Sequence, residues 1–351
     1  MRQAYSAEEP GHFEIRDVDD SPAPGSGEVQ MRVRACGVCG SDLHPLRSPE
    51  RWQSGRVRGH EISGEIIAVG EDVEQWRPGD RVAVQPNLFC GHCGNCRSGQ
   101  ITLCETEFSV VGLTRPGGYS ELLTLPQQNV FRLPDGVDFA VGALTEPLAV
   151  VAHGYRLAAE LDSLRATTGE RVLILGGGMI GLLAAFYARQ AGAGEVAITA
   201  RHEHQANSAR QLGATRVFTA DEDGEAALRE WSQANPVDLV IESVGGGGST
   251  LAQAMDAVRR GGRILVLGVA SPGATMPVGS LIGKEVRLVG SLMYGYAGKH
   301  ADYDLAIELE RRFGDVLGTL ITHRVPFDEI DRAHALALDK SSGSIKVTIE
   351  F

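Results

Sequence analysis

The pattern of hydrophobic and polar residues differs between the two halves of the chain. Between residues 1 and 150, short stretches such as Glu28–Ala35, Glu65–Val69 and Arg81–Val84 alternate apolar with polar positions. Glycine, proline and aspartate separate these stretches, which predicts half-buried strands joined by tight turns. We therefore expect an irregular, β-rich domain in this part of the chain.

Beyond residue 150 the hydrophobic pattern changes. Leu148–Ala159 has the apolar spacing of a helix. From residue 171 onward, buried strands are expected to alternate with helices, which is typical of βαβ units and a parallel sheet. The strands are expected at 171–176, 195–200, Val237–Ser243 and Arg263–Val269, and the helices near Ile180–Ala191 and Ala206–Leu212. The pattern is mixed again after about residue 290 and ends in an expected strand, Ser344–Glu350.

A glycine-rich turn follows the first of these buried strands. Leu173–Gly181 reads LILGGGMIG, so Gly176, Gly178 and Gly181 form the pattern G-x-G-x-x-G between a strand and a helix. Glycines at these places let the backbone approach a pyrophosphate, which the amino end of the helix then binds. The pattern predicts a dinucleotide site; the alternative is a tight turn that binds nothing. Further expected contacts with the cofactor are Met179, Ile180 and Gly268.

The end of the second strand indicates which dinucleotide is bound. An NAD enzyme has a carboxylate there, which accepts hydrogen bonds from the ribose hydroxyls. This chain reads AITARHE, with Ala200, Arg201 and His202 at the strand end. Ala200 leaves space, and the guanidinium of Arg201 suits a 2′-phosphate, with His202 beside it. We therefore predict NADP(H) over NAD(H), unless Arg201 is only a solvated surface residue.

Composition and charge limit the possible partners. The chain has 351 residues, of which 43 % are hydrophobic, and a net charge of -12. This negative charge argues against a nucleic-acid or anionic-membrane surface. No apolar run approaches the roughly 20 residues of a membrane span, and the amino-terminal residues lack the apolar core of a signal peptide. We expect a cytoplasmic protein, in which clustered cysteines bind metal more often than they form disulfides.

Four of the six cysteines lie in one short stretch, Phe89–Cys104, with the spacing C-x2-C-x2-C-x7-C. Four thiolates on a glycine-rich loop can bind zinc as a complete tetrahedron, which leaves no open position for a substrate. We therefore predict a structural zinc rather than a catalytic one. A dithiol redox motif would leave two cysteines unexplained, and the acidic charge disfavours a nucleic-acid-binding zinc ribbon. The predicted ligands are Cys90, Cys93, Cys96 and Cys104.

Two other segments offer the ligands of an open, catalytic zinc site. Gly37–Asp42 reads GVCGSD and Gly59–Gly64 reads GHEISG, which together supply a cysteine, a histidine and carboxylates. Residues 59–73, GHEISGEIIAVGEDV, match the pattern G-H-E-x2-G-x5-G-x2-V at every fixed position. With the four-cysteine loop, these motifs make the chain resemble the zinc-dependent medium-chain alcohol dehydrogenases over nearly its whole length.

The resemblance implies an α/β protein with two domains. One is a β-rich, GroES-like catalytic domain of residues 1–150 with 290–351, and the other is a Rossmann, NADP-binding domain of residues 151–289. Two zinc ions per chain are implied. The structural zinc would be held by the cysteine loop, and Cys39 and His60 would be ligands of the catalytic zinc.

The third ligand of the catalytic zinc differs between branches of this family. The corresponding segment here is Thr145–Leu148, without a cysteine, and so resembles the sorbitol and polyol dehydrogenases, in which a glutamate coordinates directly or through water. Glu146 is the matching residue, and Glu61 is the other candidate. Asp42 would orient a ligand from outside the coordination shell. Cys36 is expected to be a buried apolar residue.

The resemblance also implies a route for the proton of the alcohol. The zinc would lower the pKa of the substrate hydroxyl, and hydride would then pass to the nicotinamide. Ser41 would lie at the substrate oxygen, and His44 would carry the proton to solvent. An alternative for His44 is a surface histidine without this role.

The chain differs from the sorbitol dehydrogenases at two positions where those enzymes contact a polyol. Pro45 and Met293, with Tyr294 beside it, stand where an aromatic residue and an arginine are typical. The substrate is therefore expected to be a polyol, a cyclitol or a less polar secondary alcohol, with ketone reduction as the hypothesis for direction. A homodimer or homotetramer is expected from the resemblance. The alternatives are a non-catalytic nucleotide-binding zinc protein and a zinc-free quinone or enoyl reductase.

Overall fold

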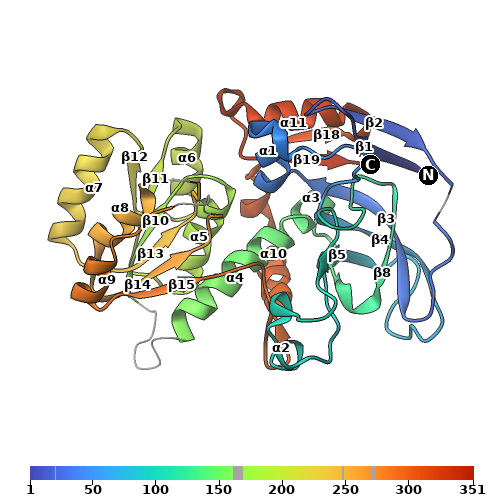
Figure 1. The fold of residues 1–351 in the computed structure, drawn as a ribbon, viewed down its shortest axis with the longest axis horizontal. Helices are drawn as coiled ribbons and strands as arrows, with labels where there is room; N and C mark the ends of the chain where they lie inside the picture. Colours follow the sequence, from blue (N-terminus) through green and yellow to red (C-terminus); the bar gives the residue numbers. More distant parts are fainter. Residues whose placement is uncertain (20, 161–168, 247–248, 270–273) are drawn as a thin grey trace. The chain divides into compact units, whose positions relative to one another are not determined.

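Two large sheets organise the structure, one in each of two units (Figure 1). The computed structural model describes residues 1–19, 21–160, 169–246, 249–269 and 274–351. The first unit is Met1–Glu146 with Gly295–Phe351, and the second is Pro147–Tyr294. Short strands dominate the first unit, whereas strands and helices alternate in the second, as the hydrophobic patterns predict.

The large sheet of the first unit has seven strands and joins distant segments of the sequence. Its order is β18-β19-β3-β4-β5-β9, and β8 also pairs with β3. Gly37, at the end of one strand, lies opposite both Glu61 and Thr348 of its two neighbours. The strands are β3 (Glu28–Gly37), β4 (Glu61–Val69), β5 (Arg81–Val84), β8 (Leu122–Pro126), β9 (Val130–Arg132), β18 (Ile321–Pro326) and β19 (Lys346–Glu350).

Shorter elements surround this sheet. The paired short strands are β1 (Arg2–Ser6) with β2 (Phe13–Asp17), β6 (Asn87–Leu88) with β7 (Ser109–Val110), and β16 (Tyr296–Ala297) with β17 (His300–Ala301). The helices are α1 (Gly40–Arg47), α2 (Gly94–Arg97), α3 (Phe139–Gly142), α10 (Asp302–Gly318) and α11 (Ile330–Leu338). Single 3₁₀ turns lie at Pro49–Arg51, Ile101–Leu103, Gln127–Asn129, Phe327–Glu329 and Lys340–Ser342.

The core of the first unit follows the alternation in β3. Met31 and Val33 are buried and Arg32 and Arg34 are exposed, as expected for a strand with one buried face. Ala35, Cys36 and Gly37 are all buried, because the end of the strand is covered on both faces. Cys36 belongs to the main apolar cluster, as expected from the sequence, and burial raises the pKa of its thiol well above the usual value.

The second unit contains six parallel strands in the order β12-β11-β10-β13-β14-β15. This order reverses between β10 and β13, which is the place where doubly wound sheets bind nucleotides. The strands are β10 (Arg171–Leu175), β11 (Glu195–Ala200), β12 (Arg216–Thr219), β13 (Val237–Glu242), β14 (Val258–Val266) and β15 (Arg287–Gly290). The predicted parallel α/β fold is therefore confirmed.

The helices of the second unit also follow the predicted pattern. The helix expected at Leu148–Ala159 is α4 (Thr145–Glu160), which begins at the boundary between the units. The others are α5 (Met179–Gln190), α6 (Glu203–Gln211), α7 (Glu222–Ala234), α8 (Thr250–Ala257) and α9 (Val278–Lys284). Within the described ranges, none of the helices is long and apolar enough to cross a membrane.

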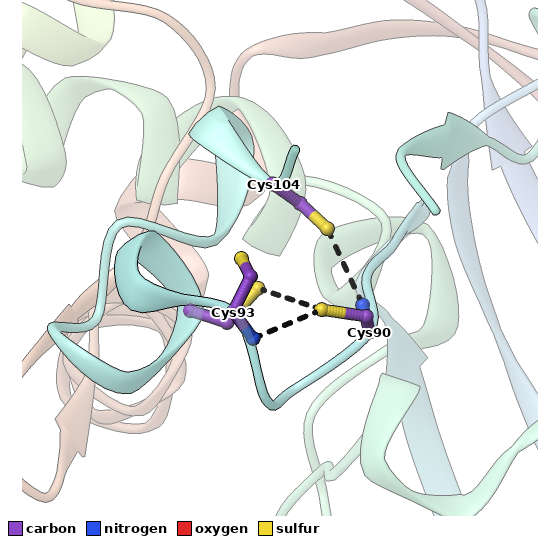
Figure 2. Close-up of side chains that lie close together, drawn as sticks. Cys90, Cys93 and Cys104 are labelled. Atoms are coloured by element: carbon purple, nitrogen blue, oxygen red, sulfur yellow. Dashed lines mark hydrogen bonds between the residues drawn. The ribbon is translucent and has the colours of Figure 1, made fainter. Parts of the chain in front are cut away.

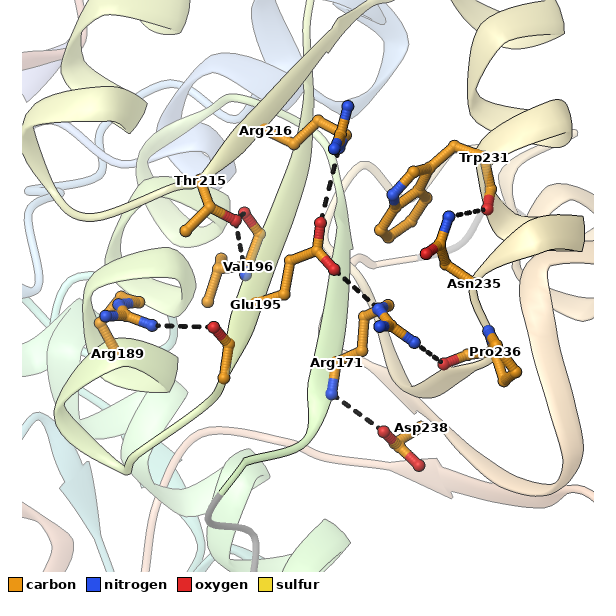
Figure 3. Close-up of polar contacts among 11 residues, drawn as sticks. Arg171, Arg189, Glu195, Val196, Thr215, Arg216, Trp231, Asn235, Pro236 and Asp238 are labelled. Carbon is orange, nitrogen blue, oxygen red and sulfur yellow. Dashed lines mark hydrogen bonds and ion pairs between the residues drawn. The ribbon is translucent and has the colours of Figure 1, made fainter.

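Charged residues tie together the amino ends of the parallel strands (Figure 3). Glu195, at the start of β11, accepts a hydrogen bond of 2.7 Å from Arg171 of β10 and lies 3.5 Å from Arg216 of β12. Asp238 of β13 accepts from the Arg171 backbone N–H at 2.9 Å. These contacts fix the edge of the sheet opposite to the glycine-rich turn, so this charged cluster is separate from that turn.

Candidate active site and metal centres

The glycine-rich turn joins β10 to α5 at the carboxyl edge of the parallel sheet. Gly176 has a φ of 110°, which favours glycine, and its N–H donates to Thr199 Oγ1 at 2.8 Å. A Cβ atom at Gly181 would lie 1.8 Å from the Gly176 carbonyl oxygen, so only glycine permits this approach of helix to turn. Since α5 begins at Met179 with Gly178 as its N-cap, the first N–H groups of the helix lack intrahelical partners and suit a phosphate.

The strand that follows ends without a carboxylate. Ala200, the last residue of β11, is 3 % exposed and lies beside the turn, since a Cβ atom at Gly177 would be 3.1 Å from its Cβ. The backbone N–H groups of Arg201 and His202 donate to Gln205 Oε1 at 3.2 and 3.3 Å, which fixes the loop. The Arg201 side chain is exposed. Gly268, after β14, lies near a different strand end, where its N–H donates to the Glu242 carbonyl at 3.0 Å.

The four predicted ligands of the structural zinc come together in one cluster (Figure 2). Their sulfur atoms all lie within 4.8 Å of one another. Backbone N–H groups point at two of them: Cys90 N donates to Cys104 Sγ at 3.4 Å, and Cys93 N donates to Cys90 Sγ at 3.3 Å. These donors favour the thiolate form, and the pKa of Cys104 falls to about 5, chiefly because of the bond from Cys90.

The spacing of the sulfurs fits a tetrahedral zinc. Bonds of about 2.3 Å to four sulfurs place the sulfurs roughly 3.8 Å apart. Cys90 Sγ and Cys96 Sγ are 3.8 Å apart. Since four thiolates complete such a shell, this loop has no position for a substrate.

A second group of potential ligands lies in the first unit, where β3, α1 and β4 meet. Ligand atoms of Cys39, His60 and Glu61 lie within 4.8 Å of one another. Cys39 is the N-cap of α1, and its N–H donates to Asp42 Oδ2 at 3.0 Å. His60 precedes β4 and is 5 % exposed. Two segments that are far apart in this part of the sequence therefore supply one buried site.

The carboxylate of Glu61 forms an ion pair with a buried lysine. Lys346 Nζ donates to Glu61 Oε1 at 2.8 Å and Oε2 at 2.6 Å, and also to the Val38 carbonyl at 3.1 Å. Burial alone would lower the pKa of Lys346, but the charges of Glu61 and Cys39 outweigh it and hold the pKa above the usual value. A Cβ atom at Gly37 would lie 2.0 Å from Glu61 Oε2, so glycine is needed there for this pair to form.

Glu146 approaches the same site from α4. It lies in the first turn of the helix and is 7 % exposed. Its neighbour Thr145 fixes the start of the helix, since Thr145 Oγ1 donates to the Gly142 carbonyl at 2.8 Å and contacts Glu310. The charge of Glu146 acts on both His60 and Lys346. Glu61 thus belongs to the group with Cys39 and His60, whereas Glu146 lies outside that group and acts on it through its charge.

The electrostatics of this site suit a cation. Burial alone would lower the pKa of His60, but the charges of Cys39, Asp42 and Glu146 outweigh it and raise the pKa well above the usual value. His60 Nδ1 and Asp42 Oδ1 are buried and have no hydrogen-bond partner among the described residues. A metal on the other nitrogen of His60 would supply the positive charge that these anionic groups favour.

The remaining predicted residues are divided between the site and its surroundings. Ser41 Oγ lies 3.4 Å from His60 Nε2, the nitrogen that faces the cluster. His44 is exposed on α1, one residue before Pro45. Met293 is half-buried with a φ of 54°, whereas Tyr294 is fully buried.

Comparison with known proteins agrees with this arrangement. Residues 25–135 match the alcohol dehydrogenase GroES-like domain, and residues 179–311 match the zinc-binding dehydrogenase family. An L-threonine 3-dehydrogenase from Anaeromyxobacter sp. (strain Fw109-5) is 32 % identical over 336 residues, which cover 93 % of this chain and 94 % of that protein. The chain belongs to the zinc-containing medium-chain alcohol dehydrogenase family. It is therefore a zinc-dependent, NAD(P)-dependent dehydrogenase, and neither the non-catalytic nor the zinc-free alternative is favoured.

Solved structures of this dehydrogenase family share the fold over the full chain. The galactitol-1-phosphate dehydrogenase from Escherichia coli has a TM-score of 0.89 and 26 % identity, and the alignment covers 100 % of both chains. A zinc-binding dehydrogenase from Sinorhizobium meliloti 1021, bound to NADP, has a TM-score of 0.85 and 28 % identity. An alcohol dehydrogenase from Escherichia coli CFT073, complexed with NADH, has a TM-score of 0.86 and 27 % identity. The latter two alignments each cover 100 % of this chain and 99 % of the other.

Three residues near the dehydrogenase's site were not predicted from the sequence. Lys346 reaches Glu61 from β19, and Tyr119 and His334 lie behind Asp42. For Lys346 there is a signal, since it is a lone lysine at the start of the apolar strand KVTIE. Tyr119 and His334 carry no such signal, because they come from separate segments whose spacing in the sequence says nothing of their contact.

Proposed function

We propose that this dehydrogenase transfers hydride between NADP(H) and a secondary alcohol or ketone at a zinc held by Cys39, His60 and Glu146. The observation that carries the proposal is the cluster of Cys39, His60 and Glu61, whose ligand atoms lie within 4.8 Å of one another. Glu146 is outside this cluster, but it is buried and its charge acts on His60. Three protein ligands leave one position for substrate. When bound there, zinc supplies a Lewis acid that lowers the pKa of an alcohol.

The ion pair of Glu61 with Lys346 counts against Glu61 as the third ligand, which favours Glu146. Both oxygens of the Glu61 carboxylate accept from Lys346, and withdrawing Glu61 would leave a buried ammonium group uncompensated. Asp42 supports the site from outside the coordination shell, because its Oδ2 accepts from the Cys39 backbone N–H at 3.0 Å.

The proton of the alcohol has a short route to water. Ser41 Oγ lies 3.4 Å from His60 Nε2, and its hydroxyl would accept the proton of the alcohol while it passes its own proton on toward His44. His44 is three residues further along α1 and exposed, so it releases the proton to solvent.

NADP(H) is the proposed cofactor because the end of β11 lacks a carboxylate and presents Arg201 and His202. Gln205 holds the backbone of both residues, which leaves the guanidinium available for a 2′-phosphate. Residues 1–150 with 290–351 are the proposed catalytic domain, and residues 151–289 are the proposed cofactor domain; these bounds lie within a few residues of those of the two units. The phosphates would contact Gly176, Gly178, Met179, Ile180 and Gly181, with Gly268 nearby.

The proposed substrate is a secondary alcohol with a second polar group, either a polyol, a cyclitol or a smaller alcohol. Similarity to an L-threonine 3-dehydrogenase and a galactitol-1-phosphate dehydrogenase supports this class, since both names describe substituted alcohols. Pro45 and Met293 favour a less polar substrate than a sugar alcohol, and Tyr294 is the other proposed substrate contact. Ketone reduction is the proposed direction in the cytoplasm, where an NADPH pool supplies hydride.

A dimer is the proposed assembly, or a tetramer built from it. Strand β15 is the edge of the parallel sheet, and apolar side chains gather on β15 and its flanking segments. Val278, Ile282, Leu288 and Leu292 are between 42 and 72 % exposed. Self-association would cover them.

Two measurements test the proposed function. Zinc analysis should give two ions per chain, and one ion would count against the catalytic site. A panel of secondary alcohols and ketones, followed by nicotinamide absorbance with each cofactor, should show turnover with NADP(H); a higher kcat/KM with NADH would refute the cofactor assignment.

A further inference from the structure

The first turn of α4 contacts a buried carboxyl group of α10. Thr145 Oγ1 lies 2.8 Å from the Gly142 carbonyl oxygen and 3.1 and 2.9 Å from the two carboxyl oxygens of Glu310. Thr145 is 0 % exposed and Glu310 is 1 % exposed, so water does not compete for these contacts. The end of α3, the start of α4 and the middle of α10 therefore meet at one hydroxyl group.

The carboxyl group of Glu310 is costly to bury at this position. Burial raises its pKa well above the usual value, and only the hydrogen bond with Thr145 opposes that rise. Among the residues that the structure describes, Thr145 is the only side chain that hydrogen-bonds with Glu310, and no cation forms an ion pair with it. An apolar side chain would fill the space without this cost. The contact with Thr145 is thus what the carboxyl group adds.

The helix that carries Glu310 is fixed to the large sheet of the first unit. Tyr303 precedes Glu310 on α10 by about two turns, so the two side chains share one face of the helix. Tyr303 Oη donates to the Val84 carbonyl of β5 at 2.8 Å, and its ring lies 4.9 Å from that of Phe131 on β9. Since β5 pairs with β4, which begins directly after His60, α10 is anchored to the same sheet as this proposed ligand.

The position of Thr145 determines that of Glu146. Glu146 is the next residue along α4 and is 7 % exposed, and its charge acts on His60. A rigid peptide bond joins the two residues, so a displacement of Thr145 also displaces the backbone of Glu146. A metal ligand has to be held within about 0.5 Å of its working position. The contact that fixes Thr145 therefore affects whether Glu146 can bind a metal.

We propose that Glu310 is a positioning residue for the metal site: through Thr145 it fixes the first turn of α4 and so holds the carboxylate of Glu146 toward the zinc bound by Cys39 and His60. The inference rests on the proposed role of Glu146 as the third ligand. Glu310 acts through Thr145 and Glu146, and not on the reacting atoms.

The zinc affinity of the catalytic site, measured on the full chain by competition with a chromogenic chelator, tests this role. Glu310→Leu and Thr145→Val should each lower that affinity by roughly tenfold, the lower end of the loss when a residue that orients a ligand is changed. The double variant should lose no more than either single variant, because both changes break the same contact. Glu310→Gln and Thr145→Ser keep a hydrogen bond between the two positions and should bind zinc like the wild type.

Two controls separate this effect from a general loss of structure. Glu308→Leu changes an exposed carboxylate on the same helix and should leave the affinity unchanged. The zinc of the four-cysteine loop should be bound equally well by every variant. Where Glu310→Leu does not fold, Thr145→Val, which replaces one hydroxyl by a methyl group, gives the same comparison.

The outcomes also distinguish this inference from the proposed function. Wild-type zinc affinity in Glu146→Gln would exclude Glu146 as a ligand, and the proposed site would fail together with the role of Glu310. A loss of affinity in Glu146→Gln without one in Glu310→Leu and Thr145→Val would overturn the role of Glu310 alone. A loss in Glu310→Gln as large as that in Glu310→Leu would also overturn it, because the hydrogen bond would then not be what matters.

Discussion

Lys346 Nζ lies 2.8 and 2.6 Å from the two carboxylate oxygens of Glu61, and neither side chain is more than 3 % exposed. A buried pair of this kind stabilises a protein little relative to apolar residues, but removing one partner leaves the other charge uncompensated. Its position beside Cys39 and His60 makes the pair part of the metal site.

Replacing Lys346 by methionine should therefore destabilise the protein. We expect a loss of about 3–5 kcal/mol in the free energy of unfolding, measured with urea on the metal-depleted protein. Lys346→Met/Glu61→Gln should recover much of the loss, because it removes both charges. If the free energy of unfolding of Lys346→Met lies within about 1 kcal/mol of the wild-type value, removing the lysine does not leave a costly buried charge.

Cysteines in the two proposed metal sites should have different roles. Cys93→Ser should lose one zinc and much stability, since the four-cysteine loop holds no substrate. Cys39→Ser should also lose one zinc but remain folded, with kcat lowered on the order of a thousandfold. Zinc analysis, thermal unfolding and turnover of both variants separate these outcomes. A folded Cys93→Ser protein without turnover would contradict the assignment.

Arg201 should decide the preference for the 2′-phosphate. Removing a charged hydrogen bond costs about 1.5–3 kcal/mol, so Arg201→Ala should lower kcat/KM for NADPH roughly tenfold to a hundredfold and leave that for NADH unchanged. Arg210→Ala is the matched control, because Arg210 is exposed on the neighbouring helix and its guanidinium donates to Glu203 and Asn207. An equal loss with both cofactors would argue against phosphate recognition.

The burial of Glu310 predicts how the stability of the protein depends on pH. Burial raises its pKa well above the ordinary 4.5, opposed by the hydrogen bond with Thr145. The folded protein thus holds a proton that the unfolded chain releases above pH 4.5, and stability falls as pH rises, by up to about 1.4 kcal/mol per unit until the folded pKa is reached.

Glu310→Gln removes this proton linkage and keeps an amide to donate to Thr145. The variant should be more stable than the wild type at pH 8, with the difference shrinking toward pH 5, as measured by thermal unfolding. Glu308→Gln, exposed on the same helix, is the control and should show no such trend. A difference that does not change with pH would mean that Glu310 is ionised in the folded protein.

Local patterns predicted most of the fold and the motif residues of the site. The strand at 171–176 and the helix near 180–191 became β10 and α5, because apolar periodicity and the glycine turn agree there. The two groups of potential metal ligands were predicted because their cysteines and histidine lie in short sequence motifs. The sequence marks Lys346 as a lone lysine in an apolar strand, but it does not reveal the partner of Lys346. Tyr119 and His334 could not be predicted, since their contacts depend on how α11 and a loop pack against α1. Hydrophobic periodicity along the sequence does not show which distant segments come into contact.

The short distances between the cysteine sulfurs affect how the enzyme responds to oxidation when zinc is absent. Cys90 Sγ and Cys96 Sγ are 3.8 Å apart, and the pKa of Cys90 falls to about 7, chiefly through Thr106. Without a metal, reactive thiolates would stand next to partners with which oxidation forms disulfides. Bound zinc would therefore protect the cysteines from oxidation as well as hold the loop in shape. If the zinc were lost under oxidising conditions, disulfides would form in the loop, and the oxidised loop could not bind zinc again.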